Sequence, residues 1–183
     1  MMFYALPLGI ALGWLRGGSL GRLGNYPFRR PELLVGAFII QLFLVRSGDL
    51  GLEIARNLVF PLHLFSYALL ISVLLINFRA PGIPVVLLGA LGNSAVIALN
   101  GGMPVDVIRL ENLGYRASAA ALRAGEIATH RALTDSTRLP FLGDILLGPR
   151  WMLGAALLSP GDLAMMVGIA WVISVGMTYD DLH

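Results

Sequence analysis

Residues 58–78 form an apolar run without a charged side chain, and this run constrains the fold more than any other feature of the chain. As a helix rising 1.5 Å per residue it is about 30 Å long, which matches the hydrocarbon core of a bilayer. Only 13% of all residues are charged and 57% are hydrophobic, whereas soluble domains carry about 25% charged residues. The sequence therefore predicts an all-α, polytopic helical membrane protein, a single membrane domain over residues 1–183 with the lipid bilayer as its surroundings.

Five segments are predicted to span the membrane, namely residues 2–15, 32–45, 58–78, 82–99 and 163–177. The first is interpreted as a retained span because its first cation, Arg16, follows the apolar run, whereas a secretory signal places positive charge before it.

The linker between the first two predicted spans is basic and contains Arg16, Arg22, Arg29 and Arg30. Cytoplasmic linkers of membrane proteins are enriched in such cations. We therefore expect the N-terminus and the segment 100–161 on the outer face and the C-terminus in the cytoplasm.

The segment 100–161 is nearly balanced in charge and is expected to form an outer-face region. Short helices are predicted at Pro104–Leu113 and Ala119–Ala124, the second with Ser118 as N-cap and Gly125 at its end.

Further along this segment, Phe141–Leu158 is apolar but is interrupted by charges and a proline. It is predicted as an interfacial or re-entrant helix, with a sixth span as the alternative. Ser159–Asp162 is predicted as a turn into a capped last helix, because Asp is favourable at a helix N-terminus.

Two absences limit the function classes. Without cysteine, the chain has no disulfide, thiolate nucleophile or Cys-ligated metal. All thirteen cations are arginine, and no cluster exceeds the pair Arg29–Arg30, so no nucleic-acid partner is predicted. A metal site is not predicted either.

Candidate site residues lie in the predicted outer half. Asn93 and Asn100 are seven residues apart and lie on one helix face. They are predicted to form hydrogen bonds between helices or, alternatively, the floor of a polar site. His130, Asp135, Arg138 and Asp144 form the densest polar group of the loop. A histidine and carboxylates can serve as acid–base pairs or metal ligands, with solvated or capping roles as the alternative.

His63 is the only ionisable residue well inside a strong predicted span. It is a structural hydrogen-bonding group or an intramembrane ligand. Haem held by His63 and His130 is one option for this site, and no other cofactor is predicted.

Gly9, Gly13 and Gly17 give a G-x-x-x-G-x-x-x-G row in the first predicted span. Such rows let helices approach closely, within one chain or toward another protein.

Four motifs together resemble a family of small bacterial multi-pass membrane proteins of unknown function, over roughly residues 20–177: Leu23–Arg29, Asn100–Val105, Thr137–Asp144 and Ser159–Asp162. The resemblance implies a bacterial cytoplasmic (inner) membrane and supplies no catalytic residues.

The sequence is compatible with three functions. The leading hypothesis is a non-enzymatic accessory or scaffold subunit that packs on other membrane subunits. The alternative is an outer-face enzyme or binder of a lipid-like or quinone-like small molecule. Transport by this chain alone ranks third, because no carboxylate for coupling lies inside its predicted spans, Glu32 being at the very start of one.

Overall fold

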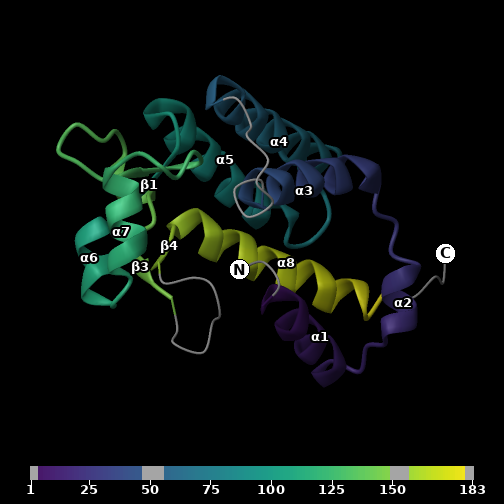
Figure 1. Cartoon of the computed structure of the whole chain (residues 1–183). Coiled ribbons are helices and arrows are strands. Elements are labelled where there is room, and N and C mark those ends of the chain that lie inside the picture. Colours follow the sequence, from purple (N-terminus) through teal and green to yellow (C-terminus); the bar gives the residue numbers. More distant parts are fainter. Residues whose placement is uncertain (1–3, 47–55, 149–156, 180–183) are drawn as a thin grey trace.

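The computed structural model describes residues 4–46, 56–148 and 157–179 (Figure 1). These residues form eight α-helices: α1 (Ala5–Leu15), α2 (Leu20–Gly24), α3 (Pro31–Arg46), α4 (Arg56–Ile76), α5 (Ile83–Asn100), α6 (Val107–Asn112), α7 (Arg116–Arg123) and α8 (Pro160–Gly176). Four short strands accompany them: β1 (Met103–Val105), β2 (His130–Ala132), β3 (Leu146–Leu147) and β4 (Leu157–Leu158). The fold is mostly helical, as predicted, but the strands correct the all-α prediction.

The five long helices form a row in the order α3, α4, α5, α8, α1 (Figure 1). Glycines at two of the seams show how the helices run. Along α1 and α8, Gly9 lies beside Ala170 and Gly13 beside Met177, so these two helices are parallel.

The α5–α8 seam runs the other way. Gly82 lies beside Gly168 and Gly89 beside Gly161, so α5 and α8 are antiparallel and their backbones nearly touch. Helices α3 and α4, and likewise α4 and α5, are consecutive in the chain and packed side by side, so each pair runs antiparallel. The C-terminal ends of α1, α4 and α8 and the N-terminal ends of α3 and α5 therefore gather at one end of the row, near residues 16, 30, 79 and 177.

Two of the described helices are long and apolar enough to cross a bilayer, α4 over Asn57–Ile76 and α5 over Ile83–Asn100. Of the five predicted spans, two therefore have the length and apolar character needed to cross a membrane, and the prediction of five is corrected to two. The helices α1, α3 and α8 have 11, 16 and 17 residues. Even 17 residues extend only about 25 Å, less than the roughly 30 Å of a hydrocarbon core.

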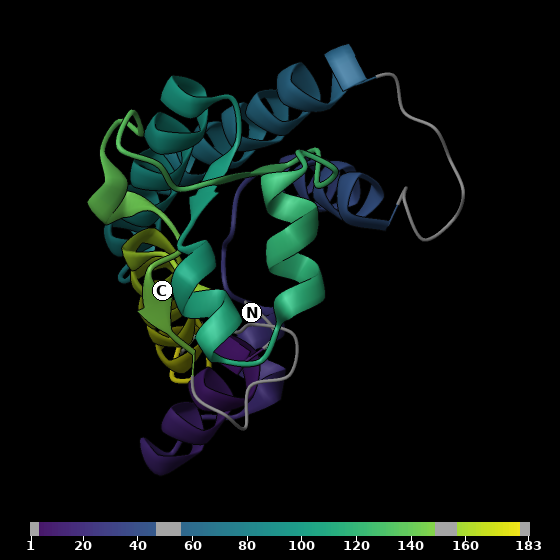
Figure 2. The same ribbon diagram turned by 60° about the vertical axis from the view of Figure 1, so that its left-hand side comes forward.

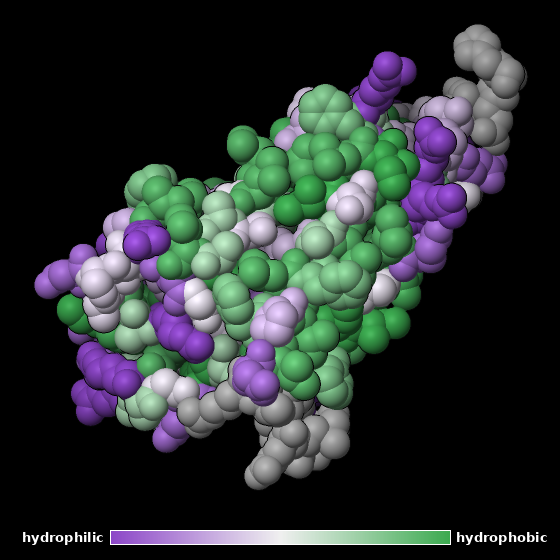
Figure 3. Space-filling model, turned by 90° about the horizontal axis from the view of Figure 1, so that it is seen from above, coloured by the Kyte–Doolittle hydropathy of each residue, from purple (hydrophilic) through white to green (hydrophobic). Residues whose placement is uncertain are grey.

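The surface of the helix row is apolar. On α3 the exposed large hydrophobic side chains are Leu34, Val35, Phe38, Ile39, Leu42, Phe43 and Val45. Figure 3 shows apolar residues filling the middle of one face, with hydrophilic residues gathered at its left and right ends.

Residues 101–148 and 157–158 form a small lobe at one end of the row, at the left in Figure 1. It has its own hydrophobic cluster, made of Val105, Val107, Leu110, Ala119, Leu122 and Leu157. Strand β1 pairs in parallel with β2, and β3 pairs antiparallel with β4. Figure 2 shows α6 and α7 packed beside these strands.

Local predictions in the lobe have mixed outcomes. Pro104 lies in β1 rather than starting a helix, because β1 pairs with β2. Helix α7 begins at Arg116 with Tyr115 as N-cap, so the Ser118 cap is wrong. Gly125 follows the helix end with φ +70, as its predicted role requires.

The predicted interfacial helix at Phe141–Leu158 is also corrected. Its described residues form the end of a 3₁₀ turn (η2, Pro140–Leu142) and the strands β3 and β4. Residues 149–156 lie outside the described residues. The predicted cap of the last helix is confirmed, since Ser159 and Asp162 form a reciprocal capping box at the start of α8.

Candidate functional site

Asp144 sits beside β1 in the lobe and is held there by its backbone. Its N–H donates to the Pro104 carbonyl (2.8 Å), and its carbonyl accepts from the Asp106 N–H (3.1 Å). Only 8% of the residue is exposed. Within the described residues its Oδ1 is buried without a hydrogen-bond partner. Such an atom costs free energy unless something binds it, so it marks a candidate site.

His130 begins β2 and faces the same carboxyl group. Its Nε2 lies 3.9 Å from Asp144 Oδ2, and its Nδ1 lies 2.8 Å from Thr129 Oγ1. Both residues are placed by the strand pairing around β1, because Met103 is opposite His130 and Val105 is opposite Asp144.

Burial keeps this pair uncharged near neutral pH. It raises the pKa of Asp144 to about 8, and the nearby carboxylate of Asp162 adds to the rise. It lowers the pKa of His130 to about 4, with the Arg131 cation adding to the fall. Desolvation disfavours the charged form of each group. A protonated Asp144 donates a hydrogen bond, and its carboxylate accepts one.

Asn93 links α5 to the start of α8 and is fully buried. Its Nδ2 donates to Asp162 Oδ1 (3.0 Å), and its Oδ1 accepts from the Ser159 hydroxyl (2.9 Å). A Cβ at Gly161 would meet Asn93 Oδ1 at 2.1 Å, so glycine is needed for this close approach. Asn93 therefore serves the interhelical role that was one of its two predicted alternatives.

His63 and Tyr67 bring α4 to the same region. Both are buried, and their ring centroids are 5.6 Å apart. His63 lies within electrostatic range of His130, and Tyr67 lies within that range of Asp144 and Asp162 and hydrogen-bonds to Asn93. Seven polar residues thus lie in one region where the helix row joins the lobe, and we call them the polar cluster: His63, Tyr67, Asn93, His130, Asp144, Ser159 and Asp162.

The other predicted site residues lie outside the polar cluster. Asn100 pairs with the Arg138 backbone, donating to its carbonyl and accepting from its N–H, both at 2.9 Å. The Arg138 side chain is exposed. Asp135 is exposed in a turn closed by Thr134 and Thr137. Of the six predicted residues, three belong to the polar cluster: His130 and Asp144, which face each other, and Asn93, which contacts Ser159 and Asp162.

Sequence reasoning missed a second backbone clamp. Asn77 follows α4, donates to the Arg29 carbonyl and accepts from the Arg29 N–H, both at 2.8 Å. It ties the start of α3 to the end of α4, as Asn100 ties the lobe to α5. A polar residue at the end of a long apolar run is the sequence signal for both.

The haem option stays a prediction. The Nδ1 atom of His130 is 2.8 Å from Thr129 Oγ1, whereas its Nε2 atom, 3.9 Å from Asp144 Oδ2, is beyond hydrogen-bond distance. In the described part of the chain no group of three His, Cys, Asp or Glu side chains is arranged to hold a metal.

The glycine row of the first helix faces this chain's own α8. A Cβ at Gly9 would lie 2.8 Å from Ile173 Cβ, and one at Gly13 would lie 2.4 Å from Met177 Sδ. Gly17 lies beyond the helix with φ +75, and a Cβ there would meet nothing within 4 Å.

A family model described as "Family of unknown function (DUF5317)" matches residues 25–174. The chain belongs to the DUF5317 family. The matched part of this DUF5317 protein contains the whole polar cluster and excludes α1. No curated protein and no solved structure matches the chain.

Proposed function

We propose that this chain is an integral membrane protein of a bacterial inner membrane that binds a small amphiphile at its polar cluster. The membrane location is supported by α4 and α5, which are long and apolar enough to span. It is also supported by the apolar middle of the helix row, which lies between two hydrophilic ends (Figure 3). In this placement the shorter helices are completed by flanking residues and by local thinning of the bilayer.

The proposed orientation places the lobe outside. Five arginines lie in the connections at the end of the row away from the lobe, Arg22 within the short helix α2 and the others next to helix ends: Arg16, Arg22, Arg29, Arg30 and Arg79. Cytoplasmic ends of membrane helices are enriched in arginine. The lobe and the polar cluster then lie at the outer face.

The observation that carries the binding function is the buried Asp144 Oδ1 without a partner in the described residues. Burying a polar atom without a hydrogen bond costs about 1–3 kcal/mol. A ligand that supplies the missing hydrogen bond recovers this free energy. A protonated Oδ1 donates to a carbonyl and an unprotonated Oδ1 accepts from a hydroxyl, so either group can supply the missing hydrogen bond.

The position of the polar cluster indicates the class of ligand. His63 and Tyr67 come from the apolar helix α4, whereas His130 and Asp144 come from the lobe. A molecule reaching both has an apolar body and a neutral head bearing a hydroxyl or carbonyl group. A quinone-like or lipid-like compound meets this description.

The test is co-purification of a small molecule. The chain, Asp144→Leu and Asp135→Leu are purified in mild detergent from native membranes, and extracted compounds are identified by mass spectrometry. We expect one compound near stoichiometric amount with the wild type, and at least tenfold less with Asp144→Leu. Leucine is close to aspartic acid in size but can neither donate nor accept a hydrogen bond.

Asp135→Leu is the matched control, because Asp135 is an exposed carboxylate of the same lobe and its replacement should leave retention unchanged. Equal retention by wild type and Asp144→Leu, or a wild type that carries no such compound, would contradict the binding proposal.

A second function, the accessory subunit, is favoured by α3. It lies at the edge of the helix row against α4 and exposes an apolar face. Another membrane protein packing on this face would bury it. The same purification tests the idea, since a stoichiometric second protein supports it and a chain that arrives without one argues against it.

A further inference from the structure

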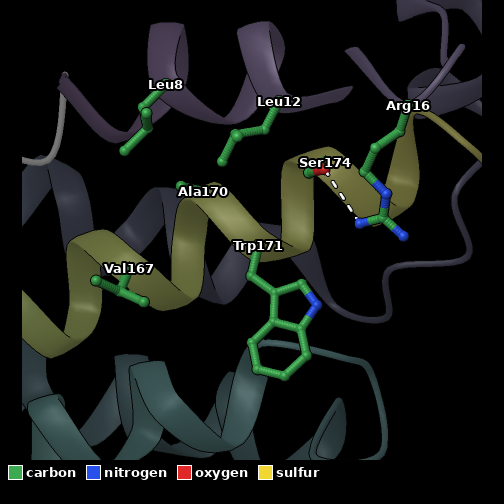
Figure 4. Close-up of a pocket in the computed structure, with 7 residues that line it drawn as sticks. All are labelled: Leu8, Leu12, Arg16, Val167, Ala170, Trp171 and Ser174. Carbon is green, nitrogen blue, oxygen red and sulfur yellow. Dashed lines mark hydrogen bonds between the residues drawn. The ribbon is translucent and has the colours of Figure 1, made fainter. Parts of the chain in front are cut away.

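An open groove runs along the seam of α1 and α8, away from the polar cluster (Figure 4). Its volume is about 310 Å³. Seven residues line it: Leu8, Leu12, Arg16, Val167, Ala170, Trp171 and Ser174. Five of them are apolar, and the two polar ones, Arg16 and Ser174, lie together at one end.

Small residues create the groove. Gly9 and Gly13 let α1 approach α8 closely, and the buried Ala170 lies along the seam between larger side chains. Leu8 and Leu12 extend from α1 on one side, and Val167 and Trp171 belong to α8 on the other (Figure 4). The result is a narrow apolar channel open to the surroundings of the helix row.

Arg16 lies at one end of the groove and carries a positive charge. Its Nη1 donates to the Ser174 hydroxyl at 3.3 Å, and among the described residues no carboxylate pairs with it. An arginine bound only to a neutral hydroxyl retains donors for an anion, and phosphate is the anion that its planar fork suits best.

The dimensions match one leaflet of a bilayer. From Leu8 to Arg16 a helix rises roughly 12 Å, close to the depth of one leaflet, about 15 Å of hydrocarbon. In the orientation proposed above, Arg16 lies at the cytoplasmic surface, where basic pockets between helices bind anionic head groups.

We propose that this groove binds one anionic phospholipid, with an acyl chain along α1 and α8 and its phosphate on Arg16. The proposal rests on the membrane location given under the proposed function, but not on ligand binding at the polar cluster. It assigns α1, which lies outside the family match, a lipid-holding role.

The experiment is native mass spectrometry of the full chain in mild detergent, titrated separately with phosphatidylglycerol and phosphatidylcholine of the same acyl chains. We expect one phosphatidylglycerol to bind at least tenfold more tightly than phosphatidylcholine. Arg16→Gln should remove this preference. Leu12→Gln should weaken both lipids, because it places a polar group in the apolar channel.

Arg79→Gln is the matched control. Arg79 is exposed at the same end of the row but does not line the groove, so its loss should leave the preference unchanged. Equal binding of the two lipids by wild type, or an unchanged preference in Arg16→Gln, overturns the proposal.

Membrane fractionation of the same cells separates the two possible failures. A chain found in the membrane that binds both lipids alike overturns the groove proposal alone. A chain absent from the membrane overturns the membrane location and, with it, the groove.

Discussion

At the scale of single residues, Asp144 and His130 determine how the lobe responds to pH. Each is uncharged in the folded chain near neutral pH, for the same physical reason: burial disfavours the ion. The consequences for stability have opposite signs, because one group is an acid and the other a base.

The sign follows from proton counts. A folded pKa of about 8 for Asp144 means that the folded state binds more protons than the unfolded one between about pH 4 and 8. The free energy of unfolding then falls as pH rises through this window. His130, with a folded pKa of about 4, is protonated first in the unfolded state, so stability rises from about pH 4 to 6.5.

We therefore expect the two effects to offset each other up to about pH 6.5. Above it, wild-type stability should fall by at most about 1.4 kcal/mol per pH unit until about pH 8. Asp144→Asn should abolish this fall and leave only the rise below pH 6.5. Thermal unfolding midpoints in detergent from pH 4 to 9 measure this. A wild-type profile that rises between pH 6.5 and 8 would mean that Asp144 is ionised in the folded chain.

At the scale of elements, the α5–α8 seam is set by backbone contact. The Cβ of an alanine at Gly89 would lie 2.4 Å from the Gly161 carbonyl oxygen, and that oxygen belongs to a helix that cannot shift alone. The same seam carries the Asn93–Asp162 hydrogen bond, so its spacing also positions the polar cluster.

Gly89→Ala should destabilise the chain by about 1–3 kcal/mol, because overpacking of a tight interface costs that much. Gly92→Ala is the control on the same helix, since its Cβ would come no closer than 4.0 Å to another side chain. It should be neutral or stabilising by up to about 1 kcal/mol through helix propensity. Thermal unfolding of both variants in detergent measures this difference. Equal unfolding midpoints for the two variants would contradict the close contact of α5 with α8 at Gly89.

At the scale of the whole molecule, the directions of the helices and the positions of five arginines distinguish the same two ends of the helix row. The parallel pair α1 and α8 and the antiparallel pair α5 and α8 give the helix row two distinct ends. A membrane protein with this arrangement has the lobe on one face and the connections that carry Arg16, Arg22, Arg29, Arg30 and Arg79 on the other.

Single cysteines can report this arrangement, because the chain has none of its own. Ser118→Cys, exposed on α7, should react with a membrane-impermeant maleimide in intact cells. Gly24→Cys, at the exposed end of α2 with nothing within 4 Å of its Cβ, should react only after the membrane is opened. The reverse pattern would invert the topology, and equal labelling of both sites in intact cells would contradict a membrane-spanning row.

The sequence alone predicted the ends of the five long helices to within about three residues. Such ends follow from the length of each apolar run and from the residues that stop a helix, and both are local features of the chain. It predicted the Ser159–Asp162 cap for the same reason. It overestimated the number of spans, because the segments 2–15, 32–45 and 163–177 were counted although each is shorter than the roughly 20 residues that cross a bilayer.

Only the tertiary structure decided which polar residues meet. Asp144 faces His130 because the isolated bridge at Asp144 and strand β2 both pair with β1, and Asn93 reaches Asp162 because glycines bring α5 against α8. The groove at Arg16 likewise depends on α1 packing beside α8, helices far apart in the chain. Contacts of this kind join distant segments, and neither periodicity nor spacing along one segment contains the information on which segments will pack together.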